Sequence, residues 1–182
     1  MKRLIVLGLA VATLSVALSS RARAQAANNN TTIPFVVITL FTPGTVGVPM
    51  DLAVAGAVQS EMDLLLRNKN VVSPITGVAI PPEITTVAIN MMTDATPAVR
   101  AQMEKALSGA GVSNSVQEQL LSNLPSLLSR PTAGQLQTVL SAFNGFVNNA
   151  NAAFLVNPPA EFLALHAILL QVSASANRAP HP

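Results

Sequence analysis

The longest patterned stretch of the chain, residues 131–177, predicts two helices that pack together. In its first half six apolar residues recur at helical steps and fall within an arc of roughly 120°. The second half, at residues 159–176, is apolar almost all round, which is typical of a helix buried at the centre of a bundle. The six apolar positions of the first half are Leu136, Val139, Leu140, Phe143, Phe146 and Val147.

Further upstream, the same three- and four-residue spacing of apolar positions predicts shorter helices. One spans about residues 50–68, and another spans 97–109, where Thr96-Pro97 forms the start. A third follows Ser115, which together with Glu118 matches the capping-box pattern. Pro125 lies inside this third helix and is expected to kink or divide it, because proline removes a backbone hydrogen bond.

Three stretches carry β-branched residues. Residues 33–41 and 71–80 are predicted to be short extended segments. Residues 84–92 have the helical period but also β-branched side chains, and we predict a helix. The fold class is therefore mainly α, a bundle of about five or six helices around the central C-terminal helix at 159–176. The alternative is an α+β fold, in which 33–41, 71–80 and 84–90 pair into a sheet.

The N-terminus resembles a secretory signal peptide. Lys2 and Arg3 precede an apolar run at residues 4–18, and a small-x-small site ends at Ala24. The run has 15 residues, fewer than the roughly 20 that a transmembrane helix needs. We expect cleavage after Ala24 and a secreted or periplasmic location. Cleavage elsewhere in 19–24, or an uncleaved anchor, is the alternative.

This pattern sets the expected domain organisation. Residues 1–24 are the signal peptide, 25–32 a flexible leader, 33–177 a single helical domain and 178–182 a disordered tail. Cleavage would remove four of the 10 basic residues and leave all 8 acids. The mature chain would then be slightly acidic, with no Lys/Arg patch for nucleic acid and no transmembrane span.

Composition narrows the picture further. The chain has no cysteine, so it has neither disulfides nor the lipid-modified cysteine of a bacterial lipoprotein, and its stability must come from packing. Only 10% of its residues are charged, which solubilises a surface weakly. Such a composition favours a protein that stays associated with something else.

The two histidines, His166 and His181, are the first candidates for chemistry. His181 lies in the terminal tail, and His166 lies on the central helix. We interpret His166 as a histidine at the edge of the bundle, hydrogen-bonded to a neighbouring carbonyl, Ser or Asn. A buried ligand or base is the alternative. With one internal histidine and no cysteine, a metal site would depend on carboxylates.

The carboxylates have sufficient structural explanations. Glu61 and Asp63 are two residues apart and point to different faces of a helix. Glu83 and Glu161 lie in first turns, and Asp94 is placed to cap the next helix. Glu104, Lys105 and Glu118 are interpreted as solvated. No nucleophile elbow, phosphate loop or calcium loop is present in the sequence.

We therefore expect no catalytic, cofactor-binding or metal-binding residue and no cofactor. A hydrolase with an acid–base pair formed across the fold is the enzymatic alternative.

The function that these observations favour is that of an exported non-enzymatic helical protein. It would act through protein–protein contact or as a structural component, with an unknown protein partner or by self-association. The alternative is a carrier of a small apolar ligand or lipid held between helices. That alternative depends on the apolar excess and on the methionines of the predicted helical faces, namely Met62, Met91, Met92 and Met103.

Overall fold

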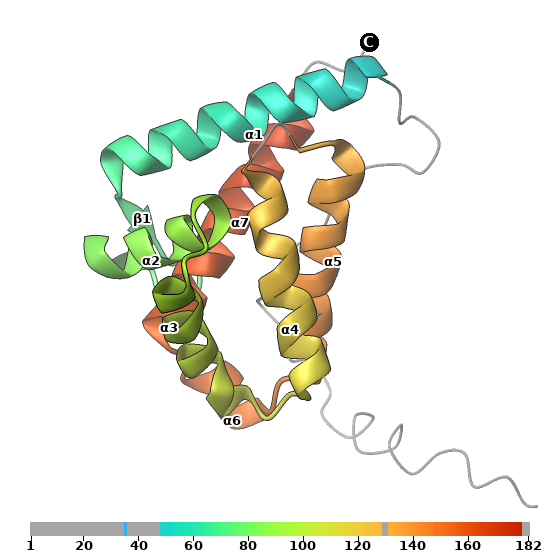
Figure 1. Ribbon diagram of the computed structural model, residues 1–182. Coiled ribbons are helices and arrows are strands. Elements are labelled where there is room, and N and C mark those ends of the chain that lie inside the picture. Colours follow the sequence, from blue (N-terminus) through green and yellow to red (C-terminus); the bar gives the residue numbers. More distant parts are fainter. Residues whose placement is uncertain (1–34, 36–47, 129–130, 180–182) are drawn as a thin grey trace, which may run out of the picture. The chain divides into compact units, whose positions relative to one another are not determined.

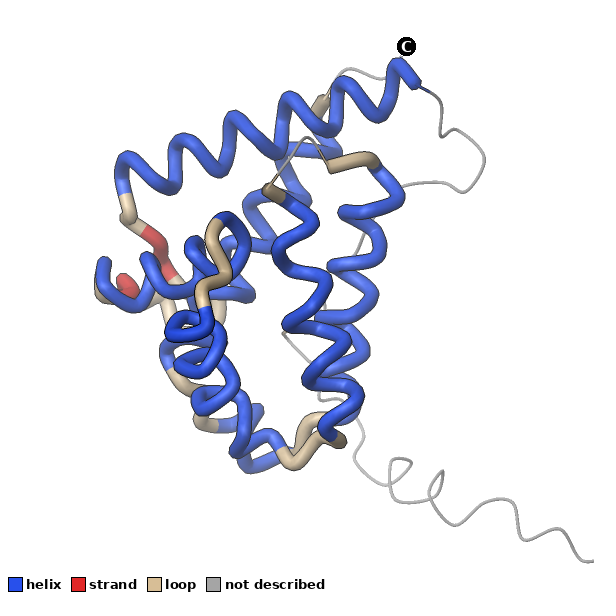
Figure 2. Tube along the Cα trace, viewed as in Figure 1, coloured by secondary structure: helices blue, strands red, loops and turns tan. Residues whose placement is uncertain are grey.

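A computed structural model of the protein describes Phe35, residues 48–128 and residues 131–179, and the structural statements below refer to these residues. They belong to one compact unit. Helices make up most of the described chain, with a single two-stranded hairpin beside them (Figure 2). The mainly α prediction is confirmed. The predicted signal peptide and leader lie outside the described residues.

Seven α-helices and two strands follow one another along this part of the chain (Figure 1). The elements are α1 (Val48–Asn68), β1 (Val71–Val72), β2 (Ala79–Ile80), α2 (Pro82–Thr93), α3 (Pro97–Leu107), α4 (Asn114–Asn123), α5 (Ala133–Asn149), α6 (Ala152–Val156) and α7 (Ala160–Arg178). Short 3₁₀ turns, η1 (Ser108–Ala110) and η2 (Leu124–Leu127), extend α3 and α4.

The C-terminal helix α7 is the element against which most others pack. It contacts α1, α2, α3 and both strands, and in Figure 1 it is the red helix behind α3 and α1. Ten of its 19 residues are buried, as its apolar circumference requires. The central helix predicted at 159–176 is confirmed and continues to Arg178.

An aromatic cluster surrounds the first turns of α7. The ring of Phe162 lies 5.1–5.9 Å, centroid to centroid, from four other phenylalanine rings. These distances are within the range in which aromatic pairs attract each other beyond their area burial. We call the aromatic cluster the set that consists of Phe35, Phe143, Phe146, Phe154, Phe162 and His166.

Helix α1 is tied to two distant elements by hydrogen bonds to its carboxylates. The backbone N–H of Ala133, in the first turn of α5, donates to Asp51 Oδ1 over 2.9 Å. Ser175 Oγ on α7 donates to Glu61 Oε2 over 2.6 Å. Asp51 therefore satisfies a donor that the helix itself leaves unpaired and fixes the position of α5 relative to α1.

The ambiguous stretch at 84–92 is helical, and the α+β alternative is wrong for the described residues. Its buried side chains recur at helical spacing and pack toward α7, so tertiary burial outweighs the β propensity of ITTVAI. Within 71–80 the structure has a hairpin, with Val71 opposite Ile80. From the segment at 33–41 the structure describes only Phe35, which lies in a turn.

The capping box predicted at Ser115 and Glu118 is wrong. Helix α4 starts two residues earlier than predicted, with Ser113 as its N-cap residue. The Ser113 side chain accepts the backbone N–H of Val116. Glu118 pairs instead with Arg100. Either serine suits an N-cap, and the earlier start lengthens the helix while Glu118 reaches a cation.

Two other helix boundaries follow from local chemistry. Helix α4 ends at Asn123, and a 3₁₀ turn that contains Pro125 follows, so the predicted division at this proline is confirmed. At the start of α5 a capping box joins Thr132 and Gln135, each side chain accepting a backbone N–H of the other residue.

The connection between η1 and α4 depends on Gly111 in a left-handed conformation, with φ of +67°. A Cβ atom at this position would lie 2.9 Å from Asn151 Nδ2. That side chain is held in place because it donates to the carbonyl of Gly109 over 3.0 Å, while the backbone N–H of Asn151 donates to the carbonyl of Ala110 over 2.8 Å. The chain therefore needs glycine at position 111 to let α6 approach η1.

We expect Gly111→Ala to lower the free energy of unfolding by about 1–3 kcal/mol, because it adds both backbone strain and a contact with Asn151. Gly56→Ala is the matched control: Gly56 lies on the exposed side of α1, with nothing within 4 Å of an added Cβ. The control should raise stability by about 0.5–1 kcal/mol. Urea denaturation followed by circular dichroism measures both changes in stability. Equal effects of the two substitutions would contradict the requirement for glycine at position 111.

Candidate functional site

His166, the internal histidine, lies in the core and not at the bundle edge, so that interpretation is wrong. Its side chain is 1% exposed. The ring lies edge-on to Phe35, at 5.3 Å between centroids, and parallel to Phe143, at 5.8 Å. The reason is geometric. Viewed down the axis of α7, His166 lies at an angle between Phe162 and Leu163, and other elements cover this side of the helix.

The imidazole of His166 has no hydrogen-bond partner at either nitrogen. Burial lowers its pKa from the ordinary 6.5 to about 4, because a cation in this position would lose its hydration. The ring is therefore neutral at pH 7. In this conformation it has no access to a substrate in solvent. His181, the second histidine, lies outside the described residues.

Two carboxylates lie where the sequence predicts them. Glu83 and Glu161 lie in the first turns of α2 and α7. Asp94 does not cap α3, contrary to expectation: it follows the last residue of α2, and the side chain of Thr96 accepts the N–H at the start of α3. A threonine directly before proline occupies the N-cap position first, which leaves Asp94 outside the helix.

Glu104 and Glu118 meet on Arg100, a contact between α3 and α4 that the sequence did not indicate. Arg100 Nε donates to Glu104 Oε1 over 2.9 Å, and the same guanidinium also bonds Glu118. Ser122 Oγ donates to Glu118 over 2.8 Å. Hydrogen bonds from Ser122 and Arg100 lower the pKa of Glu118. An ionised, exposed carboxylate of this kind is the opposite of a catalytic acid, whose pKa must be raised.

Within the described residues no group of three or more His, Cys, Asp or Glu side chains is arranged to hold a metal ion. The four methionines of the predicted apolar faces are all buried in the core. They pack in the core, and none of them lines the groove described below.

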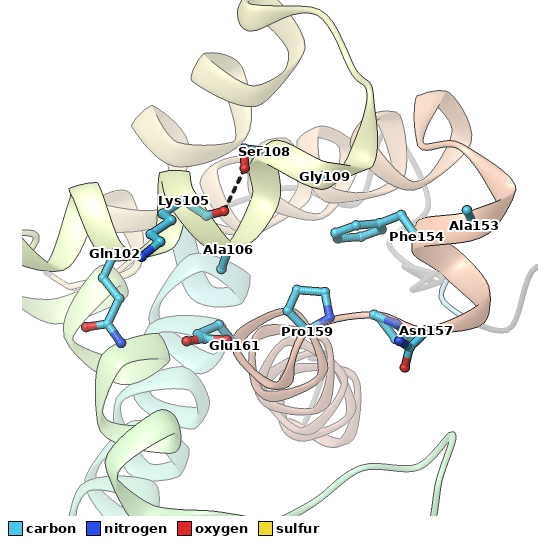
Figure 3. A pocket seen from close by; sticks show the side chains of 11 residues that line it. Gln102, Lys105, Ala106, Ser108, Gly109, Ala153, Phe154, Asn157, Pro159 and Glu161 are labelled. Carbon is cyan, nitrogen blue, oxygen red and sulfur yellow. Dashed lines mark hydrogen bonds between the residues drawn. The ribbon is translucent and has the colours of Figure 1, made fainter.

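An open groove lies where α3 and η1 approach α6 and the start of α7. Its volume is about 1010 Å³, at the upper end of the range for small-molecule sites. Figure 3 shows Gln102, Lys105 and Glu161 toward one end, and Phe154 and Asn157 toward the other. The groove combines a charged end with an apolar wall. Its other lining residues are Ala106, Ser108, Gly109, Ala153, Pro158 and Pro159.

Exposed apolar side chains gather on one stretch of the chain. Six of the eight large hydrophobic residues that are exposed in the described part lie between residues 52 and 78. Three are on α1, namely Leu52, Leu64 and Leu66, and three are on the hairpin. We call the latter the hairpin surface; its members are Val72, Ile75 and Val78, which are 46%, 37% and 63% exposed.

Among the helices of the described chain, none has the length and apolar character that crossing a membrane requires. Comparisons with protein-family models, with curated proteins and with solved structures find no match to this chain. The groove, the hairpin surface and the buried histidine are therefore the features of the described chain that bear on function.

Proposed function

We propose that this chain is an exported, non-enzymatic helical protein that acts through protein–protein contact, and that the hairpin surface binds a second copy of the chain. The supporting observation is the group of three exposed apolar side chains on one short hairpin, Val72, Ile75 and Val78, since apolar side chains that are exposed together are typical of interaction sites. The export part of the proposal depends on the N-terminal sequence pattern.

The chemistry of the hairpin favours pairing with another chain. No residue from Asn70 to Pro82 is charged, whereas natural proteins commonly protect strand edges with charge. Ser73 N–H bonds the carbonyl of Val78. Ser73 and Val78 are therefore a hydrogen-bonded pair, and hydrogen-bonded and non-hydrogen-bonded pairs alternate along an antiparallel hairpin. The next pair, Val72 and Ala79, is not hydrogen-bonded, so its backbone N–H and C=O groups point away from the partner strand.

A second copy is the partner that matches this surface best. Two identical neutral hairpins approach each other without charge repulsion. In a two-fold symmetric dimer every contact between a residue of one copy and a residue of the other occurs twice. The exposed end of α1 and the residue that follows it carry both signs of charge, from Asp63, Arg67 and Lys69. Acid and base of the two copies are therefore able to pair around the contact. Three side chains are far fewer than the roughly 20–30 residues per side of a stable interface, and the expected association is weak.

We expect the mass of the wild type in solution to rise with concentration above roughly 100 µM, because a small contact gives weak association. The triple variant Val72→Thr, Ile75→Thr, Val78→Thr should not show this rise. Sedimentation velocity measures the mass. Native mass spectrometry of protein isolated from the periplasm or culture medium reads the copy number and the cleavage site together.

The matched control is the double variant Leu128→Thr, Val156→Thr, which removes the two large exposed apolar side chains outside this stretch. It should associate like the wild type. A wild type that stays monomeric over the whole range, or a control that loses association equally, would contradict the self-association proposal.

The groove supports a second candidate, the carrier of a small apolar ligand. Lys105 at one end is a counter-ion for a carboxylate, and the wall that contains Ala106, Phe154 and Pro159 suits a hydrocarbon chain. A fatty acid has both features. The carboxylate of Glu161 is also present in the groove and would have to lie beside the cation and not beside the ligand.

For this candidate we expect oleate, measured by isothermal titration calorimetry, to bind the wild type at one site. Ala106→Trp fills the groove and should weaken binding at least about tenfold, the equivalent of 1.4 kcal/mol. Ala101→Trp, at an exposed position elsewhere on α3, should leave binding unchanged. The carrier candidate fails if oleate does not bind, or if both variants bind as the wild type does.

A further inference from the structure

The histidine at the centre of the aromatic cluster has no role in either proposed function. The residues one helical turn from His166 along α7 are all apolar: Phe162, Leu163, Leu169 and Leu170. Rings from two other segments, Phe35 and Phe143, cover the imidazole. A leucine at this position would have no polar atom to bury. The two nitrogen atoms of His166 are buried without hydrogen bonds, so the histidine lowers the stability of the protein relative to leucine.

No charge compensates the imidazole. The charged side chains on the elements that pack against α7 are Asp51, Glu61, Asp63 and Arg67 on α1, Glu83 on α2, and Arg100, Glu104 and Lys105 on α3; α7 itself carries Glu161 and Arg178. Helix α5 and both strands carry none. Burial alone accounts for the lowered pKa of His166, with no contribution from any of these groups.

We propose that protonation of His166 at mildly acidic pH opens the aromatic cluster, which makes the protein acid-responsive and exposes Phe35, Phe143 and Phe162 to solvent. The geometry that supports this is a histidine that is 1% exposed, stacked on Phe143 and edge-on to Phe35, without an acceptor for either N–H of its cationic form. A protonated ring must reach water, and it reaches water only if α7 separates from Phe35 or from α5.

The direction follows from linkage. The pKa of His166 is about 4 in the closed state and 6.5 when the ring is solvated, so the open state takes up the proton first as the pH falls. Closed-state stability is therefore complete above pH 6.5 and declines between 6.5 and about 4. A cation–π attraction from the neighbouring rings opposes this only in part, because the net change of the pKa is downward.

Glu118 acts in a different pH range. Its pKa is lowered from 4.5, so its contribution to stability is present above pH 4.5 and is lost below that value. An effect of pH between 6.5 and 4.5 therefore belongs to His166 and not to this carboxylate.

The test compares the purified wild type with His166→Leu and His181→Leu. For the wild type we expect the equilibrium constant for unfolding, from urea titrations, to rise roughly 70-fold between pH 7.5 and 4.5, because the ring is solvated in the unfolded state as it is in the open state. Fluorescence of a dye that binds apolar surface should rise over the same range while the far-UV helix signal persists. His166→Leu should show neither change, and His181→Leu should behave as the wild type.

A second measurement decides the question if His166→Leu does not fold. The chain has only two histidines, so His181→Leu leaves one imidazole signal for NMR titration. We expect that signal to stay neutral until the dye signal rises. Titration near pH 6.5 without dye binding would overturn the proposal, as would complete loss of the helix signal together with the dye response, which indicates global unfolding. Neither readout depends on self-association or on oleate.

Discussion

The structure depends on the burial of the apolar first half of one helix. Residues 162–170 of α7 are apolar apart from His166 and are buried or half-buried, and α1, α2, α3 and the hairpin pack against this helix. The aromatic cluster fills the space at its first turns, where Phe162 contacts rings from Phe35, α5 and α6. The chain has no cysteine, so this packing stabilises the fold without disulfides.

The helices could be predicted from the sequence because the spacing of apolar residues indicates which helix faces are buried. The pattern of α5 and the uniform apolarity of α7 place both helices within a few residues of their observed limits. At residues 84–92 the three-residue and four-residue spacing was a better guide than β-branching, since Ala88 and Met92 face the core. Helix starts were harder, because Ser113 and Ser115 are equally good N-cap residues and only the contact of Glu118 with Arg100 distinguishes them.

The candidate sites were less accessible to sequence reasoning because each of them joins distant segments. The groove combines Lys105 on α3 with Phe154 on α6 and Glu161 on α7, and no spacing along the chain reports that. His166 was assigned to the edge because its neighbours on one helix were considered without Phe35, which lies more than a hundred residues earlier in the sequence. Its lack of any polar partner is a tertiary property. The exposure of the hairpin is tertiary as well, since Val71 and Ile80 are buried while Val72 is not.

The hydrogen bonds of α1 have a consequence for the order in which the chain can fold. Asp51 bonds a residue 82 positions later, and Glu61 bonds one 114 positions later. Phe35 is likewise covered by rings that belong to α7. Contacts so far apart in sequence form late, because a long loop must close before they contribute. A ribosome makes the N-terminal end first, so the contacts of α1 and Phe35 with α7 form only after α7 has been synthesised. The aromatic cluster and the packing around α7 therefore form only after α7 has been synthesised.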